Sequence, residues 1–116
     1  MENVDCIFCK IIKGDLPSDK VHEDDTIIAF RDINPVAPTH ILIVPKKHIT
    51  DNNDFYPEDE EIAGRMFSVV RELAKKEGIT ESGYRLIMNT GKDGGQEVPH
   101  MHLHLIGGQK MQHKIG

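Results

Sequence analysis

The regular alternation of histidine and apolar residues between positions 100 and 106 is the clearest pattern in the chain. Successive side chains of an extended strand point to opposite faces. The apolar residues therefore share one face and the histidines share the other: Met101, Leu103 and Leu105 against His100, His102 and His104. Same-face neighbours lie about 6.6 Å apart at a rise of about 3.3 Å per residue. The run predicts a strand with one face in the core and a row of imidazoles on the other.

Shorter patterns predict the elements of the first half. Helical spacing of apolar residues before Gly14 predicts a helix over residues 5–13. The Asp24-Asp25 turn separates two short strands, 21–23 and 26–30, with Ile28 and Phe30 on one face. The apolar run 40–44, which ends at Pro45, predicts a buried central strand.

The second half predicts a long helix followed by two strands. Pro57 and the acidic residues after it are typical of a helix start, and the helix extends to Lys76 before Gly78. Its apolar stripe comprises Ile62, Met66, Val70 and Leu73, flanked by Ala63, Phe67 and Ala74. A strand over 84–89 and a glycine-rich loop over 90–96 lead to the histidine run. This order favours an α+β domain, an antiparallel sheet covered by segregated helices.

The totals narrow the class of protein. The 116 residues predict one domain over 1–116, with its core at about 5–111 and a short polar tail at 109–116. A net charge of -5 with scattered basic residues argues against nucleic acid or an anionic membrane as the main partner, although a small nucleotide remains possible. The amino terminus lacks a secretory signal and no apolar stretch approaches the ~20 residues of a membrane span, so we expect a cytoplasmic protein.

Two groups of residues are candidates for chemistry. The histidine row is compatible with metal binding and with nucleophilic catalysis by one imidazole. Cys6 and Cys9 are the only cysteines, and in a reducing compartment such a pair indicates metal or redox chemistry more than a structural disulfide. A thioredoxin-type pair would follow a strand, and the segment before Cys6 is too short to form one.

The chain closely resembles the histidine triad (HIT) family, and within it the HINT branch of bacterial purine nucleoside phosphoramidases. The motifs that carry the resemblance are Asp32-Ile33-Asn34-Pro35, Pro38-Thr39-His40, Lys47-His48, Asn89, Gly94-Gly95-Gln96 and His100-x-His102-x-His104. The resemblance implies a HIT-like fold, a five-stranded antiparallel sheet with two helices. It also implies a homodimer in which two such sheets join into one of ten strands.

The implied reaction is hydrolysis of purine nucleoside 5'-phosphoramidates to the nucleoside monophosphate and an amine. In the family, the middle histidine of the triad, here His102, attacks the α-phosphorus and forms a nucleotidyl-histidine that water then releases. By resemblance, His104 contacts the phosphate or assists proton transfer, the carbonyl of His100 fixes the tautomer of His102, and His40 joins the same polar cluster. Neutral imidazole suits the role, because it is nucleophilic near neutral pH.

The resemblance also implies how a nucleotide is bound. Asp32 accepts hydrogen bonds from the ribose hydroxyls, and Asn89 with the backbone of Gly95 and Gln96 donates to the phosphoryl oxygens. An apolar slot for the purine comprises Ile7, Phe8, Ile11, Phe30 and Ile33. Glu97 departs from the serine of animal members at this position, and its carboxylate would favour substrates with a cationic amine.

Some bacterial members bind zinc through a cysteine pair that animal members lack. By that mapping Cys6, Cys9, His48 and His100 would form a tetrahedral, structural zinc site. Buried free cysteines on an apolar helix are the alternative. Two other functions stay open from the residues: a catalytic zinc held by the triad itself, and a nucleotide-binding module with little turnover.

Overall fold

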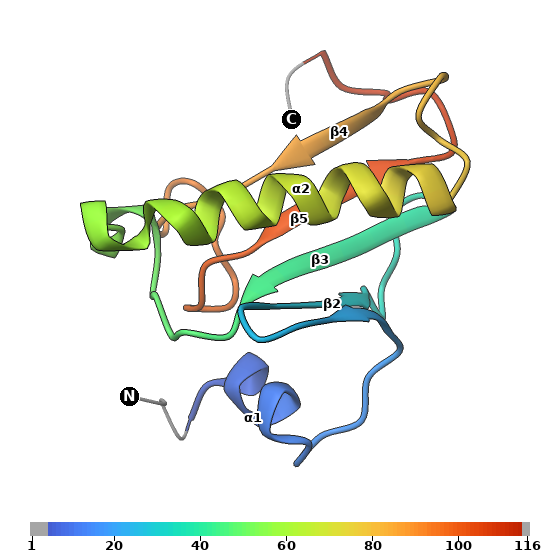
Figure 1. Cartoon of the computed structure of the whole chain (residues 1–116). Coiled ribbons are helices and arrows are strands. Elements are labelled where there is room, and N and C mark those ends of the chain that lie inside the picture. Colours follow the sequence, from blue (N-terminus) through green and yellow to red (C-terminus); the bar gives the residue numbers. More distant parts are fainter. Residues whose placement is uncertain (1–4, 115–116) are drawn as a thin grey trace.

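The computed structural model describes residues 5–114, so the last two residues of the predicted tail lie outside it (Figure 1). The elements are α1 (Ile7–Lys13), β1 (Lys20–Glu23), β2 (Ile27–Arg31), β3 (Thr39–Pro45), α2 (Glu60–Lys76), β4 (Tyr84–Ile87) and β5 (Leu103–Gly107). Two short 3-10 turns, Asn52–Asp54 and Pro57–Asp59, precede α2. No helix in this range is long and apolar enough to cross a bilayer.

The five strands form one antiparallel sheet in the order β1-β2-β3-β5-β4. The long helix α2 crosses one face, and the short helix α1 lies beside β2 and β3 on the other (Figure 1). The predicted α+β fold, with an antiparallel sheet and two helices, is therefore confirmed.

Alternation along the central strands divides the core between the two faces. Ile41 and Ile43 of β3 pack with α2, whereas Leu42 and Val44 pack with α1. His104 of β5 is paired with Leu42, so its side chain belongs to the α1 face. Leu103 and Leu105 belong to the α2 face, as the alternation predicts.

Helix α2 buries a stripe against the sheet, but not every apolar residue of the helix contributes. Met66, Val70 and Leu73 are buried as predicted, together with Val69. Phe67 is 57% exposed, so the prediction that it flanks the buried stripe is wrong. Val69, Val70 and Leu73 lie within about 60° of Met66 around the helix axis, whereas Phe67 lies about 100° from it and falls outside this buried arc.

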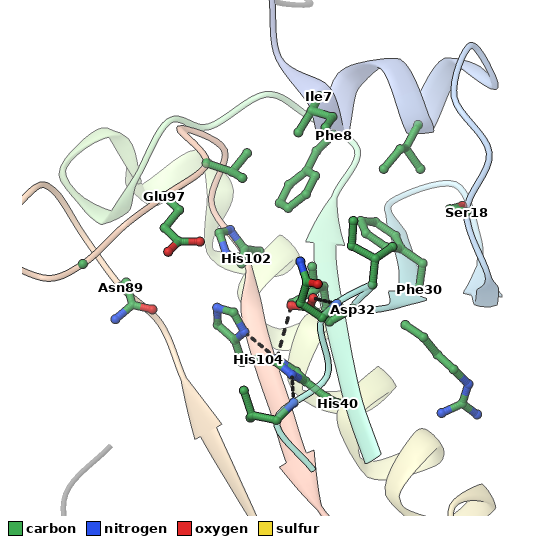
Figure 2. A pocket seen from close by; sticks show the side chains of 18 of the residues that line it. Ile7, Phe8, Ser18, Phe30, Asp32, His40, Asn89, Glu97, His102 and His104 are labelled. Carbon is green, nitrogen blue, oxygen red and sulfur yellow. Dashed lines mark hydrogen bonds and ion pairs between the residues drawn. The ribbon is translucent and has the colours of Figure 1, made fainter. Parts of the chain in front are cut away.

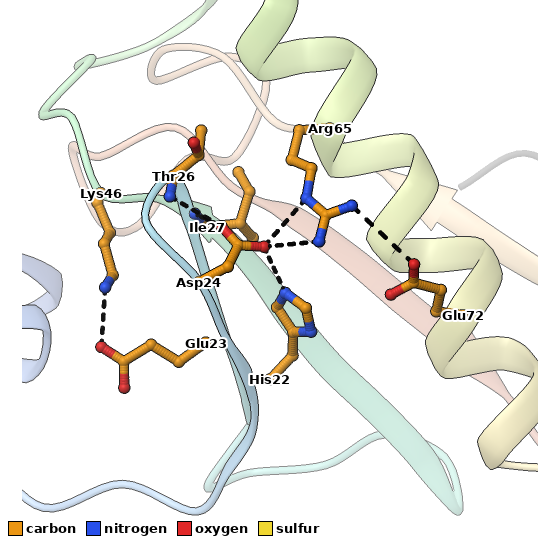
Figure 3. Close-up of polar contacts among 8 residues, drawn as sticks. All are labelled: His22, Glu23, Asp24, Thr26, Ile27, Lys46, Arg65 and Glu72. Atoms are coloured by element: carbon orange, nitrogen blue, oxygen red, sulfur yellow. Dashed lines mark hydrogen bonds and ion pairs between the residues drawn. The ribbon is translucent and has the colours of Figure 1, made fainter.

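The β1–β2 turn is tied to α2 by one carboxylate (Figure 3). Asp24 Oδ1 accepts from the backbone N–H groups of Thr26 and Ile27, each at 2.8 Å, which closes the turn. Its Oδ2 lies 2.6 Å from His22 Nε2 and accepts from Nε and Nη2 of Arg65 on α2 at 3.0 and 2.9 Å. Burial alone would raise the pKa of Asp24, but these hydrogen bonds lower it below its usual range.

The histidine run is a strand only in its second half. The predicted strand begins at His100, but β5 begins at Leu103. The N–H of His100 donates to the carbonyl of Val98 at 2.8 Å, which bends the chain, and the N–H of Met101 donates to Ile49 at 2.7 Å. His100 therefore lies outside the strand that carries His104, and the expected single row of three imidazoles is wrong.

Candidate active site and metal cluster

A cleft of about 620 Å³ opens on the α1 face of the sheet, and most of the predicted site residues line it (Figure 2). The lining includes three predicted catalytic histidines and nine predicted nucleotide-binding residues: His40, His102 and His104, with Ile7, Phe8, Ile11, Phe30, Asp32, Ile33, Asn89, Gly95 and Glu97. Gln96 and His100 do not line it. The cleft has the volume of a small-ligand site.

His102 has one ring nitrogen held and the other without a partner. Its Nδ1 lies 2.6 Å from the carbonyl oxygen of His100. A carbonyl only accepts, so Nδ1 carries the proton and Nε2 carries the lone pair. Nε2 has no hydrogen-bond partner among residues 5–114. The ring of Phe8 lies against His102, with centroids 5.1 Å apart. The arrangement leaves His102 with a fixed orientation and a nucleophilic nitrogen.

A second set of hydrogen bonds, which we name the histidine relay, joins Asp32, His40 and His104. The N–H of Val36 donates to Nδ1 of His40 at 3.2 Å, so the proton of neutral His40 is on Nε2. His40 Nε2 lies 2.9 Å from His104 Nδ1 and 3.4 Å from Asp32 Oδ2. Since His104 Nδ1 then accepts, the proton of His104 is on Nε2. His104 therefore offers a donor where His102 offers a lone pair.

Burial keeps these imidazoles neutral. It lowers the pKa of His102 and of His40 below the ordinary value of 6.5, against the opposing effects of the His100 carbonyl and of Asp32. The pKa of His104 falls to about 4, through burial first and then through its neighbours His102 and His40. A neutral imidazole at pH 7 is the form that can attack phosphorus.

The backbone N–H groups of the glycine-rich loop donate hydrogen bonds within the loop itself. The N–H groups of Gly95 and Gln96, expected to donate to phosphate, donate to the carbonyls of Lys92 and Gly91, each at 3.0 Å. The Gln96 side chain accepts from Gly91 N–H and donates to the carbonyls of Thr50 and Val98. Gln96 thus holds the loop in place rather than lining the cleft.

Asn89 and Asp32 each keep part of their hydrogen-bonding capacity. Asn89 Nδ2 donates to the Gly94 carbonyl at 2.6 Å, which leaves its second N–H and its oxygen. Asp32 Oδ1 accepts from the N–H of Asn34 at 2.8 Å, the turn contact expected of an aspartate before Asn-Pro. Both side chains face the cleft from opposite sides of His104 (Figure 2).

Aromatic and aliphatic side chains of α1 and β2 form one wall of the cleft. The rings of Phe8 and Phe30 meet edge to face with centroids 5.4 Å apart, and Ile11 is buried beside them. Ile33 is 90% exposed and lines the cleft at its rim. It follows the Asp32 turn, where the backbone leaves the sheet.

Cys6, Cys9, His48 and His100 converge under α1, and we name them the cysteine–histidine cluster. Their sulfur and nitrogen atoms all lie within 4.8 Å of one another. His100 Nδ1 is 3.3 Å from Cys6 Sγ and 3.6 Å from Cys9 Sγ, and His48 Nδ1 is 3.2 Å from Cys9 Sγ. A tetrahedral zinc with ordinary bond lengths places S and N about 3.6 Å apart. The cluster could hold a metal ion such as zinc.

Two cleft residues carry no signal in the sequence. Ser18 lines the cleft, and its hydroxyl is the one buried side-chain oxygen or nitrogen in residues 5–114 without a hydrogen-bond partner. Arg31 also lines it, with its guanidinium in a bidentate pair with Glu77 at 2.9 Å for each bond. Ser18 lies in a connector and Arg31 at a strand end, where neither spacing nor motif distinguishes them.

Residues 13–111 match the model of the HIT domain. The chain belongs to the histidine triad family. Among histidine triad proteins it is 55% identical over 105 residues to the purine nucleoside phosphoramidase of Escherichia coli K12, a match that covers 90% of this chain and 88% of that one.

Solved structures of the family share the fold closely. A histidine triad protein from Clostridium difficile superposes with a TM-score of 0.94 at 49% identity, covering 97% of this chain and 98% of the other. A HIT family hydrolase from Legionella pneumophila gives 0.93 at 50% identity, covering 97% and 100%. The fold and the sequence thus place the chain in the histidine triad family independently.

Proposed function

We propose that the chain is a purine nucleoside phosphoramidase, a hydrolase that cleaves nucleoside 5'-phosphoramidates such as adenosine phosphoramidate. The observation that carries the proposal is His102, whose Nδ1–H is held by the His100 carbonyl while Nε2 is left with its lone pair in the cleft. The Escherichia coli relative bears the same activity in its name at 55% identity. The products are a nucleoside monophosphate and an amine.

The substrate would lie along the cleft from the aromatic wall to the glycine-rich loop. Phe8 and Phe30 would contact the purine, and Asp32 would accept from the ribose hydroxyls with its Oδ2. The phosphoryl group would then lie between His102, His104 and Asn89, as Figure 2 places these side chains. Nε2–H of His104 and the free N–H of Asn89 are its donors.

Two displacements complete the reaction. His102 Nε2 forms a bond to phosphorus, the P–N bond to the amine breaks, and the departing nitrogen takes a proton from Nε2–H of His104. The relay supports that transfer, because His104 Nδ1 accepts from His40. Water then attacks phosphorus and gives its proton to Nε2 of His104, and the bond from phosphorus to Nε2 of His102 breaks, which regenerates both imidazoles. The intermediate is a nucleotidyl-histidine.

The test is to trap that intermediate. Protein is incubated with labelled adenosine phosphoramidate, quenched, and the modified residue located by mass spectrometry. We expect the label on His102, and no label or turnover in His102→Ala. His22→Asn is the matched control, because His22 lies in the turn cluster with Asp24. Full activity of His102→Ala would refute the mechanism.

We further propose that the cysteine–histidine cluster binds structural zinc. His100 Nε2 lies 2.8 Å from the Pro45 carbonyl, so its proton is on Nε2 and the lone pair of Nδ1 faces the sulfurs. Four protein ligands would leave no open position for substrate. When bound, the ion would supply cross-linking between α1, the segment after β3 and the segment before β5.

Metal analysis of freshly reduced protein tests this assignment. We expect one zinc per chain in the wild type and in His22→Asn, and none in Cys9→Ser. Absence of zinc from wild-type protein would show that the two cysteines are simply buried thiols. The readout does not depend on turnover, so it is independent of the phosphoramidase assay.

We propose a homodimer through the edge strand β4, which would extend the sheet to ten strands. β4 pairs with β5 alone among the strands of residues 5–114, and Tyr84 on it is 39% exposed. Such an edge is open to pairing with a second copy. The molar mass in solution by light scattering tests this. We also place the enzyme in the cytoplasm, where both thiols of the cluster stay reduced.

A further inference from the structure

The charges around the cleft are unusual for a site that binds a phosphate ester. Its charged lining residues are Arg31, Asp32 and Glu97. Arg31 is neutralised by its bidentate pair with Glu77, whose carboxylate also accepts from Thr39. Within residues 5–114, an anionic phosphoryl group in this cleft would therefore meet two carboxylates and no unpaired lysine or arginine.

The two carboxylates stand at different parts of the cleft. Asp32 belongs to the relay and is bonded to Asn34 and close to His40. Glu97 has no hydrogen bond or ion pair with any described residue. Figure 2 shows its carboxylate beside His102 and facing Asn89, at the end of the cleft away from Phe30 and Ser18. Glu97 thus lies at the end of the cleft that holds His102 and Asn89, opposite the end where Phe30 lies.

Glu97 is also held in that place by its neighbour. Gln96 makes three side-chain hydrogen bonds, to Gly91, Thr50 and Val98, which fix the backbone immediately before Glu97. A solvent-exposed glutamate on a mobile backbone would have no fixed position relative to a bound substrate. A glutamate on an anchored loop beside the reacting centre presents a persistent negative charge.

We infer that Glu97 selects the leaving group by charge and favours amines that carry a second, protonated amino group. This inference rests on the proposed phosphoramidase function. With the base and ribose at the end of the cleft where Phe30 lies, the substituents of the amine would extend past the phosphoryl group toward Asn89 and Glu97. A cationic leaving group compensates the carboxylate, whereas an anionic one is repelled by it and by the phosphate. The bonds made and broken are those of the phosphoramidase reaction itself.

The size of the effect follows from the exposure of Glu97. Two unit charges 4 Å apart attract by about 1 kcal/mol in water and about 4 kcal/mol near a protein surface, and exposed pairs realise the lower end. A discrimination of about 3- to 10-fold between a cationic and a neutral leaving group corresponds to that lower end. The preference is screened by salt.

The experiment compares three adenosine 5'-phosphoramidates of similar size, with 2-aminoethylamine, propylamine and glycine as leaving groups. In the wild type we expect kcat/KM to be highest for the aminoethyl compound, about 3- to 10-fold above the propyl compound, and lowest for the glycine compound. The ratio should fall to about one in Glu97→Gln and invert in Glu97→Lys. Raising sodium chloride should bring the ratio of kcat/KM values toward one in the wild type and in Glu97→Lys, and leave it unchanged in Glu97→Gln.

Asp93→Asn is the matched control, because Asp93 is an exposed acid of the same loop that does not line the cleft. It should keep the wild-type ratio. An unchanged ratio in Glu97→Gln, or an equal loss in Asp93→Asn, would overturn the role of Glu97. Failure of the wild type to cleave any of the three compounds or to label His102 would instead overturn the proposed function.

Discussion

The cysteine–histidine cluster and the histidine relay each contain two histidines, yet the backbone prepares them for opposite tasks. The Pro45 carbonyl accepts a hydrogen bond from Nε2–H of His100, which leaves the Nδ1 lone pair facing Cys6 and Cys9. In the relay the Val36 N–H occupies Nδ1 of His40, which leaves an N–H facing His104. A backbone carbonyl that accepts from one ring nitrogen leaves the other nitrogen with a lone pair that can bind a metal ion. A backbone N–H that donates to one ring nitrogen leaves the other nitrogen with a proton to donate.

The difference decides between two possible metal sites. Asp32, His40 and His104 also bring three ligand atoms within 4.8 Å of one another. For His40 to bind an ion through Nε2, its proton would have to move to Nδ1, where it would meet the Val36 N–H. The relay therefore disfavours a catalytic zinc held by these residues, whereas in the cysteine–histidine cluster the lone pair of His100 Nδ1 already faces the two sulfurs.

Breaking the cysteine–histidine cluster should give the largest effect. In Cys9→Ser we expect loss of the metal and a fall of about 3 kcal/mol or more in the free energy of unfolding, because buried Cys6 and His100 and half-buried His48 lose the ion that they share. This corresponds to a lowering of Tm by about 10 °C or more. Calorimetry with metal analysis checks it, and a Tm equal to that of the wild type would contradict it.

Breaking the relay should affect turnover and leave the metal in place. In His40→Asn the donor to His104 Nδ1 is lost, and we expect kcat for adenosine phosphoramidate to fall about 100-fold, the size of a general acid contribution. Steady-state kinetics and zinc content are measured on the same preparation. A loss of zinc equal to that in Cys9→Ser would mean that the two groups are not separate.

Lowering the pH should reduce the free energy of unfolding through His104 of the relay. Burial lowers the pKa of His104 from 6.5 to about 4, so between these values the unfolded chain binds a proton that the folded chain does not. Stability therefore falls as pH decreases through this window, by at most about 1.4 kcal/mol per pH unit from this group. Chemical denaturation at pH 7, 6 and 5 measures the slope. His104→Gln should be less steep, and an identical slope would exclude the contribution.

The smallest expected effect lies at Ser18, outside both groups. Its buried hydroxyl has no partner, so Ser18→Ala should remove a desolvation cost and raise stability by about 1 kcal/mol, or Tm by a few degrees. Ser82→Ala, at an exposed loop serine, should stay within about 0.5 kcal/mol of the wild type. Thermal melts of the three proteins decide, and a clear loss in Ser18→Ala would show that the hydroxyl is bonded in solution.

The elements and faces of the fold were predictable because periodicity reports burial directly. Ile28 and Phe30 share the α1 face, and Leu103 and Leu105 the α2 face, as alternation predicts. The start of β5 was not predictable, because the N–H groups of His100 and Met101 donate hydrogen bonds to the carbonyls of Val98 and Ile49, and the folded chain brings these carbonyls into place. The prediction for Phe67 was wrong for a related reason, since hydropathy does not show how wide a face of the helix the sheet can cover.

The residues of the site were found through family motifs, but their tasks depend on hydrogen bonds that no motif encodes. The glycine-rich loop illustrates this, because the amides of Gly95 and Gln96 close the loop on itself. Ser18 and Arg31 were missed, since serine in a connector and arginine at a strand end are ordinary. The folded chain brings the connector after α1 and the end of β2 to the same cleft.

His100 joins the two groups through different parts of one residue. Its ring belongs to the cysteine–histidine cluster, while its main-chain oxygen orients the ring of His102. Every amino acid at position 100 carries that oxygen, so a substitution there removes the imidazole from the cysteine–histidine cluster but not the carbonyl that orients His102. A conventional scan of the triad would count His100 among the residues that touch substrate, although its side chain does not line the cleft and faces the sulfurs of Cys6 and Cys9 instead.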